Sequence, residues 1–195
     1  FTVKTDFSAR RIFYFFAASV NAQKVTAPKP LFDDPVYHGA ADPVIIYNKQ
    51  KKKWWMLYTN RRASIQDSTV QWVHGTRIGI AESKDGVKWK YVDTCNINYR
   101  SDEGYTHWAP DVIEHNGTFH MYLTYVPGTF KDWSHPRVIV HLASKDLVNW
   151  NYESTLNLAN QKVIDASVFK INDSLWRMWY NNEKDGKSIY YADSK

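Results

Sequence analysis

Three aspartates open apolar segments of this chain, and their carboxylates are the groups best placed for acid–base chemistry. Asp42, Asp111 and Asp165 each begin a short apolar run that is followed by a turn and a second apolar run. Carboxylates that converge in a cleft repel one another, so the pKa of at least one rises while the others stay ionised. Such a group supplies a general base, a proton donor or a cation site. A single aspartate here would cap a strand or form a turn, but three in register favour chemistry.

Aromatic and polar side chains near these aspartates indicate a ligand that carries hydroxyl groups. Residues 105–110 read Tyr-Thr-His-Trp-Ala-Pro and lead directly into Asp111, and Arg61 follows the second apolar run of the first segment. A tryptophan face stacks on a sugar ring, and Arg and His side chains hydrogen-bond hydroxyl groups. Trp108 has no counterpart elsewhere in the chain, which favours a ligand contact over packing, and His107 and Arg61 are further candidates.

The segments that would position these residues repeat along the chain. Residues 42–58, 111–123 and 165–180 each hold an apolar run opened by aspartate, a turn and a second apolar run. The three methionines of the chain occupy the same place in the three copies. Internal repetition of this kind is the signature of a repeat architecture.

A second element follows each of these segments. Residues 83–91 read Ser-Lys-Asp-Gly-Val-Lys-Trp-Lys-Tyr and align without a gap onto residues 144–152, Ser-Lys-Asp-Leu-Val-Asn-Trp-Asn-Tyr. Residues 192–195, Ala-Asp-Ser-Lys, match residues 81–84, Ala-Glu-Ser-Lys, and begin a third copy. We therefore expect the sequence to stop within a repeat and to be the N-terminal part of a longer domain.

Each repeat predicts four short strands. Asn-Gly, Asn-Asp and Asp-Gly turns between apolar runs are typical of β-hairpins, and no segment has the sustained period of a long helix. Four-stranded units that recur every ~50–70 residues are typical of β-propeller blades, with a β-sandwich as the alternative. The first strand of each blade lines the central channel, so the three aspartates would converge there. We expect an all-β propeller of which about three blades are present.

The order and spacing of these motifs resemble glycoside hydrolase family 43. Residues 107–117, His-Trp-Ala-Pro-Asp-Val-Ile-Glu-His-Asn-Gly, are similar to its second-blade motif, and residues 41–44, Ala-Asp-Pro-Val, to its first-blade motif. Residues 163–169 resemble its third-blade motif, and residues 144–150 resemble a blade edge shared with the related families 32, 62 and 117. The resemblance covers residues 31–195.

This resemblance implies a five-bladed β-propeller that hydrolyses linkages of plant and algal polysaccharides. It implies that Asp42 is the general base, or the nucleophile if the chain is closer to retaining family 32. Asp165 would tune and orient the acid, an assignment weakened by Ala166 in place of the usual proline, and Asp111 would contact substrate in the channel. The family's general acid is a glutamate of the fourth blade, and Glu183 is a poor substitute. No cofactor is expected to be required, although clustered carboxylates permit a channel calcium ion like that of some relatives.

Composition excludes several other classes. Cys95 is the only cysteine, so there is no intrachain disulfide and no cysteine-based metal site. His74, His107 and His120 lack the spacing of metal ligands, so no metal site is predicted. No apolar stretch reaches the ~18 residues of a membrane span. The net charge of +5 is spread out, and the lysine run at 51–53 predicts a solvated hairpin tip, so no nucleic-acid partner is expected.

The N-terminal residues predict export. Two arginines at 10–11 precede an apolar run at 12–20, and Val-Asn-Ala at 20–22 forms a small-x-small cleavage site. A buried strand is the alternative. We expect residues 1–22 to be a signal peptide with upstream residues, cleaved after Ala22, and residues 23–195 to belong to the propeller of a secreted or periplasmic protein.

Three functions compete for this chain. The first is a glycosidase with an oligo- or polysaccharide substrate, and the second is a carbohydrate-binding propeller without catalysis. The third is a protein-interaction propeller, which predicts an exposed apolar patch instead of a polar channel mouth. We expect the first. The sugar, the linkage, the stereochemical course and the oligomeric state stay open.

Overall fold

Alternating apolar residues separated by tight turns form strands through most of the chain. The computed structural model describes residues 26–100 and 104–195, so the predicted signal peptide and its cleavage site lie outside the described residues. Within these ranges the one helical element is a short 3-10 turn, η1 (Gln71–Val73). The strands are β1 (Ala40–Asn48), β2 (Lys53–Asn60), β3 (Ile78–Ser83), β4 (Trp89–Thr94), β5 (Asn96–Asn98), β6 (Thr106–His115), β7 (Thr118–Val126), β8 (Val138–Ser144), β9 (Asn149–Thr155), β10 (Val163–Asn172), β11 (Leu175–Asn182) and β12 (Ser188–Ser194).

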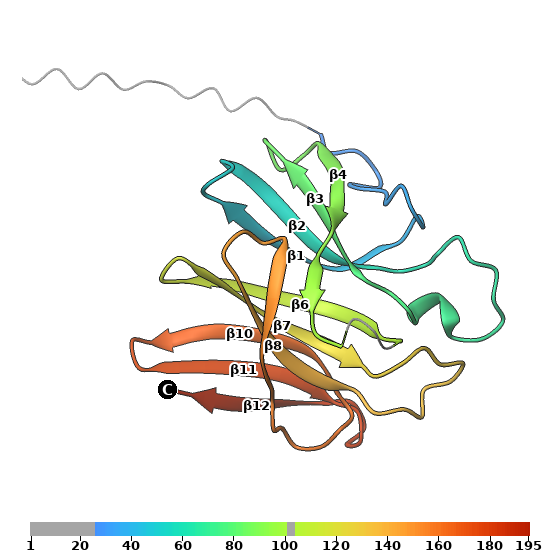
Figure 1. Cartoon of the computed structure of the whole chain (residues 1–195), viewed down its shortest axis with the longest axis vertical. Helices are drawn as coiled ribbons and strands as arrows, with labels where there is room; N and C mark the ends of the chain where they lie inside the picture. Colours follow the sequence, from blue (N-terminus) through green and yellow to red (C-terminus); the bar gives the residue numbers. More distant parts are fainter. Residues whose placement is uncertain (1–25, 101–103) are drawn as a thin grey trace, which may run out of the picture.

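The strands assemble into three sheets that follow the order of the chain (Figure 1). Blade 1 is β1-β2-β3-β4, blade 2 is β6-β7-β8-β9 with β5 added beside β9, and blade 3 is β10-β11-β12. The predicted four strands per repeat are therefore present in blades 1 and 2. Strand β5 pairs in parallel with β9, Asn96 opposite Asn149, so the segment that leaves blade 1 extends blade 2. The first strands β1, β6 and β10 pack beside one another, as blades around a channel require.

The two ends of the blades differ. Short hairpin turns follow β1, β6 and β10 on the left of Figure 1, whereas the longer loops after β2 and β7 project on the right. Lys51 and Lys52 of the lysine run lie in the β1–β2 turn, as predicted, whereas Lys53 begins β2. Because the first strands begin at the loop end, residues at their starts lie next to these loops.

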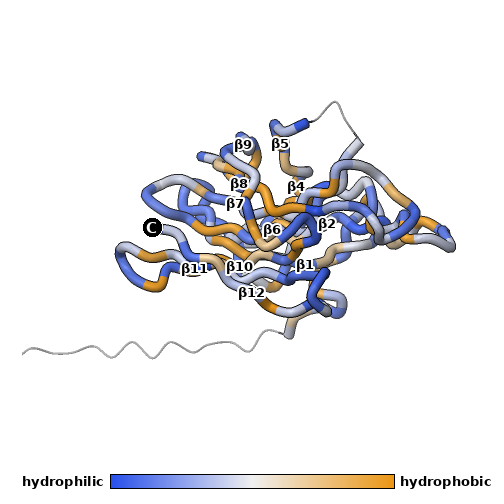
Figure 2. Tube along the Cα trace, turned by 90° about the horizontal axis from the view of Figure 1, so that it is seen from below, coloured by the Kyte–Doolittle hydropathy of each residue, from blue (hydrophilic) through white to orange (hydrophobic). Residues whose placement is uncertain are grey.

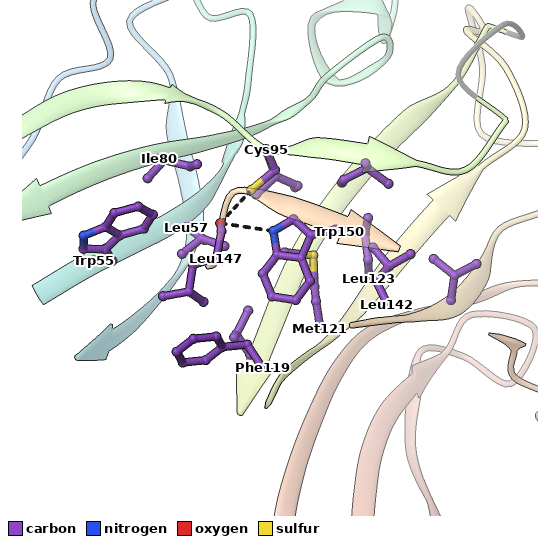
Figure 3. Close-up of a cluster of buried hydrophobic side chains, with 14 of the residues drawn as sticks. Trp55, Leu57, Ile80, Cys95, Phe119, Met121, Leu123, Leu142, Leu147 and Trp150 are labelled. Atoms are coloured by element: carbon purple, nitrogen blue, oxygen red, sulfur yellow. Dashed lines mark hydrogen bonds between the residues drawn. The ribbon is translucent and has the colours of Figure 1, made fainter. Parts of the chain in front are cut away.

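The largest apolar core lies between blades 1 and 2. Figure 3 shows side chains of β2 and β3 facing those of β7, β8 and β9, and the sulfur of Cys95 lies among them. Full burial of a large apolar side chain stabilises a fold by about 1.5–3 kcal/mol. Apolar stretches, orange in Figure 2, accordingly follow the strands through the middle of the molecule. The buried members include Trp55, Leu57, Ile80, Phe119, Met121, Leu123, Leu142 and Trp150.

The gapless repeat at residues 83–91 and 144–152 builds the same turn twice. The indole of Trp89 donates to the carbonyl of Gly86 at 3.0 Å, and that of Trp150 donates to the carbonyl of Leu147 at 3.1 Å. Gly86 has φ 74° and Leu147 has φ 67°. A leucine tolerates this left-handed conformation here because its side chain is fully buried in the core.

A recurring hydrogen bond joins neighbouring blades. The hydroxyl of Thr59 in blade 1 accepts the backbone N–H of Ala109 in blade 2 at 2.8 Å. The hydroxyl of Thr124 in blade 2 accepts the N–H of Asp165 in blade 3 at 3.1 Å. Asn181 holds the corresponding place in β11, and its Oδ1 is buried without a hydrogen-bond partner among the described residues.

The free face of blade 3 is apolar. Ile189 is 69% exposed and Tyr191 is 60% exposed, whereas the corresponding Ile78 and Ile80 of blade 1 are fully buried because blade 2 covers them. Phe169 on the same face is 64% exposed. This face therefore has the composition of an inter-blade surface that nothing in the described part of the chain covers.

Candidate active site

A β-bulge near the start of each blade's first strand sets the direction of the site residues. The strand register shifts after Ala41 in β1, after Trp108 in β6 and after Ile164 in β10. Asp42, Ala109 and Asp165 sit in these bulges with φ of 50°, 44° and 58°. A non-glycine residue in this left-handed region costs of order 1–3 kcal/mol, and bulges re-aim side chains, often beside active sites.

These bulges correct the predicted register of the three aspartates. Asp42 and Asp165 are equivalent, but their equivalent in blade 2 is Ala109 and not Asp111. Asp111 follows its bulge, level with Val44 and Ser167. The sequence alignment missed this shift because a bulge is a backbone feature. The three aspartates still share one cavity of ≈ 280 Å³ along the first strands.

The loop end of the blades holds a pocket of ≈ 500 Å³. Blades 1, 2 and 3 all contribute to its wall, together with the loops after β2 and β7 and the turn after β11. Four of the six predicted site residues line it, namely Asp42, Arg61, Trp108 and Asp165. The rest of the wall consists of Val73, Trp133, Arg137, Lys162, Ile164, Glu183 and Lys187.

The Asp42 carboxylate is held in a defined direction. Arg61 approaches its Oδ2 with Nη2 at 3.1 Å, and the Thr59 hydroxyl donates to the same oxygen at 3.2 Å. Both side chains of the ion pair are 36% exposed, so the carboxylate remains open to the pocket. Such a group can accept a proton from a bound water or attack a bound substrate.

Asp165 faces the same pocket with a different environment. Desolvation raises the pKa of its carboxyl group, and the nearby charges of Asp42 and Glu183 raise it further, while Arg61 and Lys187 act in the opposite direction. Its carboxyl group has no hydrogen bond or ion pair within the described ranges. Two carboxyl groups with different environments on one pocket are typical of acid–base sites.

Asp111 has a structural partner. Its Oδ2 accepts the backbone N–H of Val168 in β10 at 2.6 Å, which ties blade 2 to blade 3. Burial raises the pKa of this carboxyl group, and the N–H groups of Val168 and Val112 oppose that rise. Asp111 lies on the cavity along the first strands, outside the ≈ 500 Å³ pocket.

His107 does not reach the pocket. It is 3% exposed, and its ring stacks on that of Tyr105 with centroids 4.4 Å apart. Burial lowers the pKa of His107 to about 3, with a smaller contribution from Arg77. The imidazole is enclosed against the rings of Tyr105 and Tyr125 outside the ≈ 500 Å³ pocket, and a substrate contact by His107 stays a prediction.

Trp108 points the other way and lines the pocket. Its indole N–H donates to the carbonyl of Val73 at 2.5 Å, and 8% of the residue is exposed. Trp133, in the loop after β7, offers a larger face because it is 49% exposed. Trp133 has a counterpart in blade 1, because Trp72 lies six residues before Ile78 just as Trp133 lies six residues before the equivalent Ile139. The signal that singled out Trp108 therefore did not apply to Trp133.

An ion pair that the sequence did not indicate fixes this side of the pocket. Arg137 is 4% exposed, and its Nε pairs with the Glu183 carboxylate. Its Nη1 also donates to the carbonyls of Trp133 and His135, each at 3.2 Å. The guanidinium therefore holds the loop that carries Trp133. Since Glu183 is occupied by this pair, it remains a poor substitute for a general acid.

The channel calcium ion stays a prediction. No group of three or more His, Cys, Asp or Glu side chains gathers closely enough to hold a metal ion in the described part of the chain. Asp42 is engaged by Arg61, and Asp111 by the backbone of blade 3.

No helix within the described ranges is long and apolar enough to cross a membrane.

Several solved structures are similar to this chain. The endo-arabinase of Bacteroides thetaiotaomicron is 19% identical, with 83% of this chain and 53% of that chain covered and a TM-score of 0.58. A family 117 glycoside hydrolase of Zobellia galactanivorans is 12% identical, with 83% and 54% covered and a TM-score of 0.59. An N-acetylgalactosamine deacetylase of F. plautii, in complex with blood group B trisaccharide, is 19% identical, with 73% and 40% covered and a TM-score of 0.58.

These likenesses show the fold. The predicted all-β, five-bladed propeller is confirmed, and the chain makes up part of it. The chain spans 40% to 54% of the three structures' own lengths. No curated protein matches the chain. The family model of glycosyl hydrolases family 43 matches residues 32–194. The chain therefore belongs to glycosyl hydrolases family 43.

Proposed function

We propose that the protein containing this chain is a glycosidase whose reaction takes place in the ≈ 500 Å³ pocket. The observation that carries the proposal is the placement of Asp42 and Asp165. They occupy equivalent bulges of two blades and line one pocket, with Asp42 ion-paired to Arg61 and Asp165 without a partner in the described ranges. Oriented carboxyl groups on one cleft are the equipment that glycosidic hydrolysis requires.

In the proposed mechanism, Asp42 promotes the attack on the anomeric carbon of the sugar. As a general base it takes a proton from water while the water oxygen bonds to the anomeric carbon and the glycosidic bond breaks. In inverting enzymes the acid and the base lie about 6.5–9.5 Å apart, which leaves room for that water. Arg61 and Thr59 hold the Asp42 carboxylate in position. If the enzyme retains configuration, Asp42 instead forms the covalent bond to the sugar.

Asp165 is proposed to position and tune the acid. Desolvation and the carboxylates around it raise the pKa of Asp165. When Asp165 is ionised, its negative charge in turn favours a proton on a neighbouring carboxyl group. The proton donor itself is proposed to come from a further blade, following the family resemblance. Trp108 and Trp133 supply aromatic surface for a sugar ring.

We propose an oligo- or polysaccharide of plants or algae as the substrate. One structural neighbour is an endo-arabinase, and a second is a family 117 glycoside hydrolase. The proposed export of the protein, which rests on the signal peptide predicted at residues 1–22, fits a polymer that cells meet outside the cytoplasm. The deacetylase among the neighbours acts on a different bond, so the chemistry has to be tested directly.

The test measures sugar release by the full-length protein from aryl-glycosides and from arabinan, xylan and agar oligosaccharides. Asp42→Asn keeps the size of the side chain and is expected to lower kcat by about 10²–10⁴-fold, the usual contribution of a general base. Asp173→Asn, in the β10–β11 turn, is the matched control. Unchanged release by Asp42→Asn contradicts the proposal. Sugar binding by both variants without release by any form of the protein favours the non-catalytic propeller.

A further inference from the structure

Two amines on the blade 3 side of the pocket have no carboxylate partner. Four cationic side chains line the pocket. Arg61 is paired with Asp42 at 3.1 Å, and Arg137 is paired with Glu183. Lys162 and Lys187 form no ion pair with any residue in the described ranges.

The backbone of Lys162 is paired with the two residues of the buried ion pair, Arg137 and Glu183. Its carbonyl accepts the N–H of Glu183 at 3.0 Å, and its backbone forms a bridge with Arg137. Its Nζ lies 3.4 Å from the carbonyl oxygen of Trp133. The ammonium group therefore sits beside the loop whose tryptophan is the most exposed aromatic surface of the pocket.

Lys187 approaches the pocket from the turn between β11 and β12. The turn is closed by a hydrogen bond from the N–H of Ser188 to the carbonyl of Asp185 at 3.0 Å, and Lys187 itself has φ 62°. Its charge acts on Asp165, where it opposes the rise in pKa. Lys187 thus contributes to the electrostatic field at the Asp165 carboxyl group.

The charges of the pocket leave a positive surplus. Among the described residues that line the pocket, the two arginines are neutralised by their partners, which leaves Lys162 and Lys187 opposite one remaining carboxyl group, that of Asp165. A neutral sugar is recognised through hydroxyl groups and needs no such surplus. Cationic side chains that converge on a cleft attract anions and bind oxyanions through charge-assisted hydrogen bonds.

We propose that the pocket binds a sugar that carries an oxyanion, a uronate carboxylate or a sulfate ester, which Lys162 and Lys187 contact. The sugar ring would lie against the exposed face of Trp133. This inference rests on the proposed function, because it takes the pocket to be the glycoside site. It adds the substrate class, which the two carboxyl groups alone do not determine.

The test is calorimetric titration of the full-length protein with three matched probes, namely galactotriose, trigalacturonate and 6-sulfated galactotriose. One anionic probe is expected to bind at least about tenfold more tightly than the neutral probe at low salt, and the difference should shrink in 0.5 M NaCl because screening weakens exposed ion pairs. Tighter binding of the uronate or of the sulfate identifies which oxyanion is recognised.

The variants Lys162→Gln and Lys187→Gln are each expected to lose most of this preference while still binding the neutral probe. Lys170→Gln is the matched control, because Lys170 pairs with Asp173 in the β10–β11 turn. Equal affinity for all three probes, or an anion preference unchanged in both variants, overturns the inference and leaves the glycosidase proposal standing. Absence of binding by every probe also overturns the inference, whereas the glycosidase proposal is decided separately by the sugar-release assay.

Discussion

The Arg137–Glu183 pair offers a prediction whose magnitude follows from its burial. The side chains of this pair are 5% and 10% exposed. Arg137→Met keeps the length of the side chain but leaves the Glu183 carboxylate without its partner and frees the carbonyls of Trp133 and His135. Breaking a buried pair from one side costs about 3–5 kcal/mol. That is a large share of the free energy of unfolding of a whole domain, which is ~5–15 kcal/mol.

The assay is urea unfolding followed by tryptophan fluorescence. The double variant Arg137→Met/Glu183→Gln is expected to be more stable than Arg137→Met alone, because the uncompensated charge is gone, and the cycle isolates the pairwise energy. Arg177→Met is the control. Arg177 pairs with Asp193 at 2.7 Å on an exposed edge, and surface pairs contribute little. A loss below about 1 kcal/mol in Arg137→Met would refute the claim that this pair holds the pocket wall.

Three further predictions concern the aspartates and the free face of blade 3. The pKa of Asp165 is raised in the folded state, so its stabilising contribution is present at acid pH and is lost as pH rises through that pKa. Asp165→Asn should therefore melt at a higher temperature than the wild type at pH 7.5 and at the same temperature as the wild type at pH 3. A variant and a wild type that melt at the same temperature at pH 7.5 as well as at pH 3 contradict this prediction. Asp111→Ala should cost about 1–3 kcal/mol in chemical unfolding because the N–H of Val168 loses its acceptor, whereas Asp111→Asn should cost less; equal losses would exclude that role. Residues 23–195 should associate in sedimentation velocity through the free face of blade 3, and Ile189→Lys with Tyr191→Lys should weaken this association; a monomer that melts cooperatively argues against it.

The blades were predictable because their signals are local. Hairpin turns and alternating apolar runs lie within ten or twenty residues of one another, and the repeated Ser-Lys-Asp segment forms the same turn in blades 1 and 2. The parallel addition of β5 to β9 was not predicted, since it joins residues about fifty positions apart and has no motif of its own.

The site was predicted in part. The structure brings four of the predicted residues to one pocket, namely Asp42, Arg61, Trp108 and Asp165, and their roles stay predictions. His107 lies outside this pocket because neighbours in a strand point to opposite faces, so its side chain is directed away from that of Trp108. The alternating direction of side chains along a strand would have been enough to predict this difference.

The remaining residues depend on geometry that the sequence does not display. The bulges that make Asp42, Ala109 and Asp165 equivalent positions of the three blades are changes of backbone register. Arg137 joins the loop after β7 to the end of β11, and no spacing of residues along the chain predicts that contact. The signal peptide, the secreted or periplasmic location and the oligomeric state stay predictions.

Chemical rescue of an Asp42 variant tests the central claim most directly. In full-length Asp42→Ala, the side chain that is proposed to activate water, or to attack the sugar, is replaced by a small gap in the pocket. Azide is a nucleophile that needs no base, so it should restore cleavage and form a glycosyl azide with any aryl-glycoside that the wild type hydrolyses. The same treatment should leave Asp165→Ala unrestored. Wild-type turnover in Asp42→Ala, or the absence of azide rescue together with the absence of a glycosyl azide, would contradict a catalytic role for Asp42.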